Sequence, residues 1–340
     1  MKAGIVGASG YAGIELLRIC ASHPALDVVV ATANTKAGER LASDAPSLGG
    51  YYPTMSYERF DPDLLDGLDV VFFALPHGES QKVLPSIESR VGAVVDLAAD
   101  FRLKDPGLYP TWYGAAHSAP ELLGRFAYGL PELFRGGLIG ARWVAAAGCY
   151  PTAAALALAP LVRAGLVERS GIVVDAVSGV SGAGRAPSER LHFAAVDGDF
   201  LAYGLLRHRH TPEIEQAAGA QVLFTPHLAP MVRGILATCY ARPAAGAGEL
   251  STSDVLGVLG DSYAGEPFVT VVEQSPSTKA TAGSNCAQLT ARVDPRTGWV
   301  VVLCALDNLV KGASGQAVQC ANLALGLPET TGLPLVGLYP

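Results

Sequence analysis

The sequence predicts an α/β protein in which a doubly wound parallel sheet domain is followed by an α+β domain. Two patterns predict this: short apolar strands alternate with helical segments in the first 148 residues, and strands predominate from residue 172 onward. The length of 340 residues supports two domains, because a single hydrophobic core stops growing at roughly 250 to 300 residues. Half of the residues are hydrophobic, as in a compact folded chain.

The first half of the chain repeats a strand–helix–strand pattern. Strand patterns occur at residues 3–7, 28–32, 70–74 and 93–97, and helical patterns at residues 11–22 and 79–89. This alternation gives parallel strands joined by crossover helices, so we expect one nucleotide-binding domain over residues 1–148.

The second half is richer in strands. They are expected at residues 172–178, 234–241, 268–272, 287–293 and 299–306. We expect residues 149–311 to form a catalytic and substrate domain. A last helical pattern begins near residue 312, and the segment 312–340 is expected to pack back on the first domain.

Charge and cysteine usage restrict the class of protein. The net charge of −7 and the lack of a Lys/Arg run disfavour a nucleic-acid or membrane-surface partner and favour a small-molecule substrate. Six scattered cysteines without a CxxC pair indicate a reducing compartment, so we expect a cytoplasmic protein. No secretory signal pattern opens the chain, and Gly148, Pro151 and Pro160 interrupt its longest apolar run.

A glycine-rich turn separates the first strand pattern from the first helix. Its sequence is Gly7-Ala8-Ser9-Gly10-Tyr11-Ala12-Gly13. Glycines at this junction let the backbone approach a pyrophosphate, and the helix N-terminus presents N–H groups to the anion. The turn predicts a Rossmann-type dinucleotide site, and the alternative is a plain glycine turn.

The end of the second strand pattern favours NADP over NAD. An NAD site carries an acid there for the ribose 2′-hydroxyl, but this chain reads Ala31-Thr32-Ala33-Asn34-Thr35-Lys36, with Arg40 nearby. Lys36 and Arg40 would attract a 2′-phosphate. The alternative for both is ordinary surface charge.

Cys149 has the sequence setting of a nucleophile. It stands between an apolar strand pattern and an Ala/Leu-rich helix, after Gly148 and before Pro151. This places Cys149 in the first turn of the helix, where N–H groups and the dipole favour a thiolate. The alternative is a buried core thiol.

Two histidines are candidates for proton transfer. His208 and His210 precede a helix that opens at Thr211 or Pro212, and Glu213 follows. A histidine beside a reactive cysteine can pass protons during thiohemiacetal formation and collapse, and Glu213 could orient one of the rings. Two histidines without a third ligand are a weak zinc signal, so no metal site is predicted.

The motifs together resemble the N-acetyl-gamma-glutamyl-phosphate reductase family, which is related to aspartate-semialdehyde dehydrogenase, and the similarity runs nearly end to end. Besides the glycine turn, the resemblance is carried by residues 96–103 (DLAADFRL), 128–132 (YGLPE), 148–152 (GCYPT), 178–185 (SGVSGAGR), 208–213 (HRHTPE), 224–228 (FTPHL) and 307–312 (DNLVKG). It implies an enzyme of arginine biosynthesis that uses NADPH to reduce an acyl phosphate to an aldehyde through a cysteine thioester. It further implies a second domain that dimerises and a homotetramer.

The resemblance also implies the site residues. The catalytic set is Cys149 and His210, with His208 and Glu213 close by. The cofactor set is Gly7, Ser9, Gly10, Tyr11, Ala12, Gly13, Thr35, Lys36, Pro76, Ser181, Gly182 and Asn308. Arg102, Ser178 and Arg185 are expected to hold the substrate, because an arginine fork suits its oxyanions, with Ser181 as a further candidate. Each of these four could instead stabilise a loop or form an interdomain salt bridge.

One departure from the family pattern leaves alternatives open. The family usually has Asn-Pro before Gly-Cys, and this chain has Ala146-Ala147. A related group of lysine-pathway reductases, which act on a carrier-bound aminoadipyl phosphate, also lacks that proline. A non-catalytic NADP-binding sensor and a metal-dependent hydrolase are the rivals from other classes. The joint presence of the glycine turn, Cys149 and both histidines counts against the sensor, and the lack of a third ligand at suitable spacing counts against the hydrolase.

Overall fold

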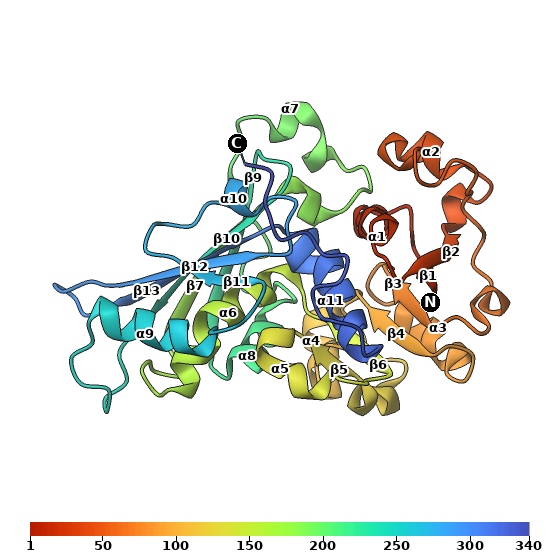
Figure 1. Cartoon of the computed structure of the whole chain (residues 1–340). Helices are drawn as coiled ribbons and strands as arrows, with labels where there is room; N and C mark the ends of the chain where they lie inside the picture. The colour runs from red at the N-terminus through yellow and green to blue at the C-terminus, as the bar shows by residue number, and fades with distance from the viewer. Residues whose placement is uncertain (340) are drawn as a thin grey trace. The chain divides into compact units, whose positions relative to one another are not determined.

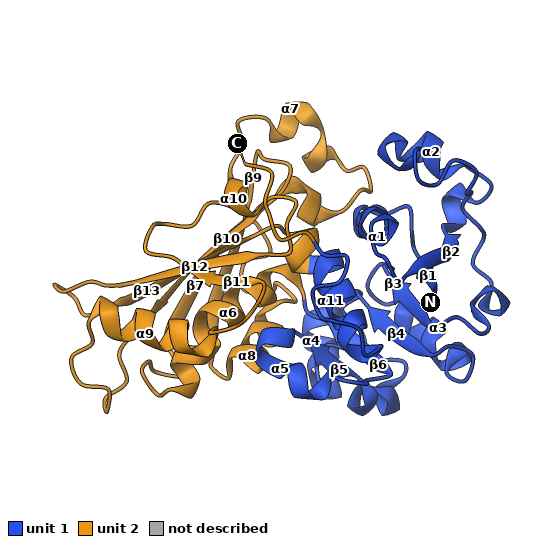
Figure 2. Cartoon of the chain, viewed as in Figure 1, with its two compact units in different colours: residues 1–147, 313–333 blue, residues 148–312, 334–340 orange. Residues whose placement is uncertain are grey.

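The computed structural model describes residues 1–339 and divides the chain into two compact units. Unit 1 contains residues 1–147 and 313–333, and unit 2 contains residues 148–312 and the segment from Pro334 onward (Figure 2). The division differs from the expected one at the C-terminus, because only part of the 312–340 segment belongs to the first unit.

Unit 1 is built on a six-stranded sheet in which every pairing is parallel. Its strands are β1 (Lys2–Val6), β2 (Asp27–Thr32), β3 (Val70–Phe73), β4 (Ala93–Asp96), β5 (Ala127–Gly129) and β6 (Trp143–Ala146). Their order is β2-β1-β3-β4-β6-β5. From β1 the strand order runs to β2 on one side and to β3 on the other, so the switch point of the sheet lies between β1 and β3. Doubly wound sheets bind nucleotides at this point, at the carboxyl ends of the strands.

The helices of unit 1 lie around this sheet, with the short α2 apart from it (Figure 1). They are α1 (Tyr11–Ala21), α2 (Leu41–Asp44), α3 (Ser80–Ile87), α4 (Tyr109–Tyr113), α5 (Pro131–Phe134) and α11 (Gly315–Ala324). Helix α11 packs on β4, β5, β6 and α1, so the last helix of the chain completes the first unit. The other face of the sheet is packed by α3 and the 101–126 segment. Leu84 and Ile87 of α3 form one hydrophobic cluster there with Val71, Phe73 and Val94 of the strands.

Unit 2 is built on a seven-stranded mixed sheet of order β11-β12-β13-β10-β7-β9-β8. Its strands are β7 (Ile172–Gly179), β8 (Leu201–Ala202), β9 (Val222–Ala229), β10 (Ile235–Ala241), β11 (Val269–Val271), β12 (Ala287–Val293) and β13 (Val300–Leu306). The pairs β7–β9 and β11–β12 are parallel and the others are antiparallel.

Unit 2 also contains helices, the longest of which packs on the sheet. They are α6 (Cys149–Arg163), α7 (Phe193–Val196), α8 (Thr211–Ala218), α9 (Thr252–Ser262) and α10 (Thr278–Thr281). Helix α6 packs on β10 and β13, with α8 and α9 beside it. The alternate residues of β7, β10 and β13 point away from α6 and stay half-exposed: Val173, Asp175, Val177, Leu236, Thr238, Tyr240, Val301 and Leu303. Unit 2 therefore has an open sheet face that is largely apolar.

Helix α6 continues through a proline because another side chain compensates for it. Pro160 has no N–H to donate to the carbonyl of Leu156, one turn earlier. The Tyr263 hydroxyl, buried beside α9, donates to Leu156 O at 2.6 Å instead. Helix α6 thus reaches Arg163, and the Leu156 carbonyl keeps a hydrogen-bond donor at this turn.

The expected fold class is confirmed, and the predicted strands agree with the structure to within one or two residues at each end. Strand β9 was not among the predicted strands; it contains Pro226, which cannot donate a hydrogen bond to the ladder. Within residues 1–339 no helix has the length and hydropathy needed to cross a bilayer.

Candidate active site and cofactor site

The expected position of Cys149 at a helix start agrees with the structure. Cys149 is the first residue of α6, directly after β6, and Gly148 is the N-cap with an extended backbone (φ −69°, ψ 159°). The thiol is partly exposed, and no side chain caps this helix. The first-turn N–H groups and the positive end of the helix dipole therefore surround the sulfur.

Glu213 braces the turn that carries Cys149. Its carboxylate is fully buried and accepts a hydrogen bond from the Gly148 backbone N–H at 2.8 Å. The sequence analysis predicted that Glu213 could orient a histidine ring. The structure adds a contact that sequence reasoning did not anticipate, between α8 and the N-cap of α6.

His208 is a neutral histidine held among aromatic rings. Its Nδ1 accepts the backbone N–H of His210 at 3.1 Å, so the proton of the neutral ring lies on Nε2. Its ring packs edge-on against Tyr150, Tyr203 and Phe224. Burial, together with the nearby Arg209 charge, lowers the pKa of His208 to about 4.

His210 lies next to His208 and Tyr150. The ring centroids of His210 and His208 are 4.8 Å apart, and those of His210 and Tyr150 are 6.0 Å apart. His210 is also the N-cap residue of α8, on which Glu213 stands in the first turn. The fold thus gathers all four predicted catalytic residues in unit 2.

Two tyrosines extend this cluster and were missed by sequence reasoning. Tyr150 Oη donates to His227 O at 3.0 Å, and Tyr203 Oη donates to Tyr150 Oη at 3.2 Å. Burial raises the pKa of Tyr150 above its ordinary value and that of Tyr203 to about 12. Both hydroxyls therefore remain protonated donors at neutral pH. Tyr150 could have been found from its place in the GCYPT motif, whereas nothing around Tyr203 marks it.

A π-helical turn, η9 (Val310–Ser314), approaches Cys149 closely. A Cβ placed on Gly312 would lie 2.8 Å from Cys149 Cβ and 3.2 Å from its Cα, so only glycine leaves Cys149 undisturbed here. The preceding Lys311 is fully buried, with its ammonium group 5.7 Å from the centroid of the Phe268 ring. π-Turns within helices are frequent at functional sites.

The unit 2 residues predicted to contact the cofactor form one hydrogen-bonded group. Asn308 is buried, donates through Nδ2 to Ser181 Oγ at 2.9 Å and accepts the Gly234 N–H through Oδ1 at 2.7 Å. A Cβ on Gly182 would lie 2.6 Å from Ser178 Oγ. Asn308 therefore comes together with Ser178, Ser181 and Gly182, although 127 positions separate it from Ser181.

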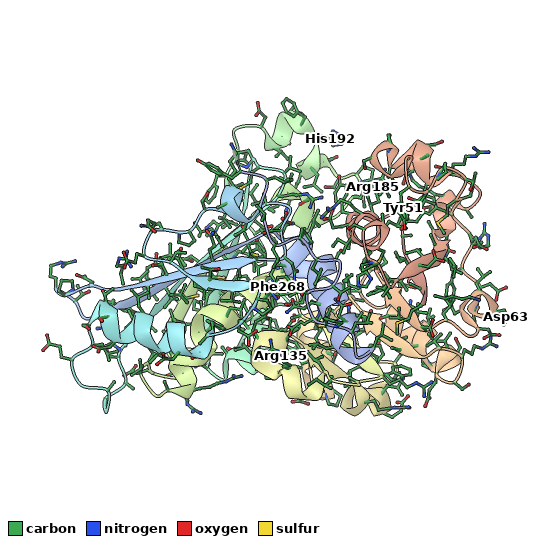
Figure 3. All side chains as sticks on the ribbon, in the orientation of Figure 1. Tyr51, Asp63, Arg135, Arg185, His192 and Phe268 are labelled. Atoms are coloured by element: carbon green, nitrogen blue, oxygen red, sulfur yellow. The ribbon has the colours of Figure 1, made fainter. Side chains whose placement is uncertain are left out.

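Arg185 follows this group closely in sequence, three residues after Gly182. It follows the short helical turn η7 (Val180–Ala183) and is partly exposed (Figure 3). Its predicted contact with substrate remains a prediction.

The glycine turn of unit 1 has the geometry of a dinucleotide site. Gly7 has φ +85°, and a Cβ there would lie 2.5 Å from Ala74 O; a Cβ on Gly13 would lie 2.5 Å from Ala8 Cα. Only Gly7 O lies within 4 Å of a Cβ built on Gly10, at 3.7 Å, which leaves open space at the start of α1. No side chain caps α1 at Gly10, so the turn fits the pyrophosphate of a dinucleotide.

The segment after β2 contains an acid that sequence reasoning did not place there. The Lys36 ammonium group pairs with Asp44, whose side chain is almost fully buried and also accepts the Tyr57 hydroxyl at 3.0 Å. Thr35 and Arg40 are exposed. The positive charge of Lys36 is thus partly compensated, and Arg40 remains exposed to solvent near the same turn.

Arg102, predicted to bind substrate, is built into the frame of unit 1. It is 7% exposed, and its guanidinium donates to Ala146 O at 2.8 Å and Leu97 O at 2.7 Å. These bonds hold together the carboxyl ends of β4 and β6, and Ala146 lies three residues before Cys149 in sequence. The predicted role in substrate binding remains a prediction.

Comparison with known proteins assigns the family. Residues 2–140 match the semialdehyde dehydrogenase NAD binding domain, and residues 149–308 match the semialdehyde dehydrogenase dimerisation domain. The chain is 51% identical to the N-acetyl-gamma-glutamyl-phosphate reductase of Desulforudis audaxviator, with both chains covered in full. It is 49% identical to the same enzyme of Symbiobacterium thermophilum, over 100% of this chain and 99% of the relative.

The chain belongs to the N-acetyl-gamma-glutamyl-phosphate reductase family. The resemblance expected from the motifs is therefore confirmed. This reductase chain also has the fold of aspartate semialdehyde dehydrogenases. Its TM-score is 0.68 to the Vibrio cholerae enzyme II complexed with ASA, at 15% identity over 96% of this chain and 98% of the other. It is 0.67 to the Candida albicans enzyme with NADP, at 15% identity over 96% and 99%.

Proposed function

We propose that this protein reduces N-acetyl-gamma-glutamyl phosphate to N-acetylglutamate 5-semialdehyde and phosphate, a step of arginine biosynthesis, through a thioester on Cys149. The relatives that match over their full length, which are named N-acetyl-gamma-glutamyl-phosphate reductase, support this reaction. The observation that carries the mechanism is the position of Cys149 at the first residue of α6, with Glu213 fixing the preceding turn. A thiol at a helix N-terminus is set up for nucleophilic attack.

Acyl transfer starts when His210 accepts the Cys149 thiol proton and the sulfur attacks the acyl carbon. The C–S bond forms while the C–O bond to phosphate breaks, and inorganic phosphate leaves. When bound, NADPH supplies a hydride to the carbonyl carbon of the thioester. The alkoxide on Cys149 then reforms a carbonyl as the C–S bond breaks, and His210 returns its proton to the departing sulfur. His210 thus ends in the state in which it began.

The two histidines divide the work in this scheme. His208 has its Nδ1 lone pair engaged by the His210 N–H and is held neutral by burial, which suits a fixed scaffold better than a proton carrier. His210, at the N-cap of the helix that carries Glu213, is assigned the acid–base step. We assign the binding of substrate oxyanions to Arg102, Ser178 and Arg185.

The cofactor is proposed to be NADPH. The glycine turn supports a dinucleotide, and the absence of an acid within Ala31–Lys36 together with exposed Arg40 supports the 2′-phosphate. Lys36, which also pairs with Asp44, is proposed to assist in binding the 2′-phosphate. A reactive thiol and a reduced nicotinamide both fit a reducing compartment, so we place the enzyme in the cytoplasm.

The dimerisation domain indicates a homo-oligomer. The open apolar face formed by β7, β10 and β13 is the surface that we propose a second copy covers, since a half-exposed apolar sheet face is stabilised by such packing. A pair of such dimers would give the tetramer implied by the resemblance.

The deciding experiment is the phosphate-dependent oxidation of N-acetylglutamate semialdehyde, followed by the absorbance of the reduced nicotinamide, with wild type beside Cys149→Ser. We expect wild type to reduce NADP and the variant to lose at least about 10³-fold in rate, because the acyl-enzyme cannot form efficiently. NADPH binding should be equal in the two proteins. An active Cys149→Ser enzyme would remove the thioester route. Activity with aminoadipate semialdehyde alone would transfer the protein to the lysine pathway.

A further inference from the structure

The loop after β3, residues 74–79, lies against the glycine turn. Ala74 N donates to Val6 O at 2.8 Å, and Ala74 O occupies the space that a Cβ of Gly7 would need. The loop stands at the β1/β3 switch point, where a dinucleotide lies across the carboxyl edge of such a sheet. Whatever fixes its shape therefore fixes one wall of the cofactor site.

Asp100 fixes this loop with both oxygens of one buried carboxylate. Its Oδ1 accepts hydrogen bonds from His77 Nδ1 at 2.8 Å and Gly78 N at 2.7 Å. Its Oδ2 accepts from Ser80 Oγ at 2.8 Å and Gln81 N at 3.1 Å. Four donors from one loop and the following helix start thus converge on a side chain that is 0% exposed, which is strong anchoring for a charged acceptor.

Asp100 is itself held from a second direction. Its backbone carbonyl accepts the Tyr109 hydroxyl and His117 Nε2, the latter at 2.8 Å. Burial alone would raise the pKa of Asp100, but the hydrogen bonds from His77, Gly78 and Ser80 bring it below its ordinary value. The anchor is therefore an ionised carboxylate in a fixed place.

The neighbouring Asp96 is a second buried acid on the same segment. It is also 0% exposed, and burial together with the charge of Asp100 raises its pKa well above the ordinary value. Its Oδ2 lies 3.0 Å from Ser80 Oγ. The Ser80 hydroxyl thus lies within hydrogen-bond distance of both buried carboxyl groups.

We propose that Asp100 is a positioning residue for cofactor binding, because its carboxylate holds the 76–81 segment in the shape that receives the dinucleotide. This role rests on the proposed use of NADPH. It goes beyond the Cys149 chemistry, since no part of Asp100 is required to contact substrate.

The test compares Asp100→Asn with Asp96→Asn, two isosteric changes on the same chain segment. In Asp100→Asn an NH₂ group of the new amide faces hydrogen-bond donors. In Asp96→Asn the amide oxygen can still accept the Ala98 N–H and the NH₂ group can donate to Ser80 Oγ, so the bonds to Asp100 are kept. We expect the Kd of NADPH, measured by fluorescence titration, to rise at least about tenfold in Asp100→Asn and to change less than about twofold in Asp96→Asn. The rate of Cys149 alkylation by iodoacetamide should stay at the wild-type value in both.

A third variant, Ser80→Ala, keeps the carboxylate and removes one of its four donors. It should raise the Kd of NADPH about two- to fivefold even if Asp100→Asn fails to fold. Equal Kd values in wild type, Asp100→Asn and Ser80→Ala would overturn the proposal. If wild type binds NADPH but does not turn over the acyl phosphate, the proposed function fails while the Kd comparison still decides the role of Asp100.

Discussion

His208 shows how one side chain can be fixed by its surroundings at the expense of its own acid–base chemistry. Its ring is enclosed by Tyr150, Tyr203 and Phe224, and its Nδ1 is occupied by a backbone N–H. Protonation would break that hydrogen bond and place a charge beside Arg209. His208 therefore contributes to the rigidity of the segment that carries His210.

The neutral state of His208 predicts a dependence of stability on pH. In the unfolded chain its pKa returns to about 6.5, whereas in the folded protein it is about 4. The unfolded state then binds more protons between these values, so stability is fully present above about pH 6.5 and falls as the pH drops toward 4. In His208→Gln this loss should be smaller by on the order of 2–3 kcal/mol, as measured by urea unfolding at successive pH values.

The exposed His192 provides the control for this measurement. His192→Gln should follow the wild-type curve of unfolding free energy against pH, because its ring is in solvent. Parallel curves for wild type and His208→Gln would show that His208 is protonated as readily in the folded state as in the unfolded chain.

At the scale of single residues the sequence predicted the local structure around a residue better than its distant partners. Cys149 could be placed at a helix start because Gly148 and Pro151 are local signals. The contact of Glu213 with the Gly148 N–H joins residues 65 apart in sequence, and the four bonds to Asp100 span 19 to 23 positions. No local pattern encodes such partners, because the fold as a whole brings them together.

Among the elements, the contact between η9 and the start of α6 leaves the least room for change. In Gly312→Ala the new methyl group would meet Cys149 Cβ at 2.8 Å, and the backbone of the first helical turn would have to shift. We expect a fall in kcat of at least about tenfold, because displacement of a reacting group by an ångström costs on this scale. Overpacking should also cost about 1–3 kcal/mol of stability, read from thermal unfolding, while the Kd of NADPH stays unchanged.

Gly257 in α9 is the matched glycine. It is exposed, and no atom lies within 4 Å of a Cβ built there, so Gly257→Ala should leave kcat unchanged and raise stability by up to about 1 kcal/mol through helix propensity. Wild-type kcat in Gly312→Ala would mean that the close approach does not position the thiol.

The elements themselves were largely predictable, because buried parallel strands read as short apolar runs. Strand β12 was predicted with its exact bounds and β1 to within one residue. Strand β9, which contains Pro226, was not predicted. The short β5 and β8 were not predicted either, because pairing with neighbouring strands defines them more than their own composition does. Burial and pairing thus overrode local propensity where the two disagreed.

At the scale of the whole molecule, the open sheet face of unit 2 predicts association. On this face Thr238 of β10 stands between Asp175 of β7 and Leu303 of β13. An aspartate in place of Leu303 would bury a charge without a partner in a packed interface. Leu303→Asp should therefore shift the mass measured by light scattering toward a single chain at micromolar concentration.

Phe193 in α7 is a large apolar residue of the same unit that lies away from this face and is 81% exposed. Phe193→Asp should keep the wild-type mass. If Leu303→Asp remains folded and keeps the wild-type mass as well, the open face is not the contact between copies.

Helix α11 has a consequence for how the protein is made. It is buried along nearly its whole length and covers β4, β5 and β6, yet 165 residues of unit 2 (312 − 147) separate it from the rest of unit 1. A ribosome that adds about 5–20 residues per second leaves those strands uncovered for roughly 10–30 s after Ala147 has been joined. The unit whose first strand is synthesised first is thus completed late, and during that interval its apolar strands are a natural binding surface for a chaperone.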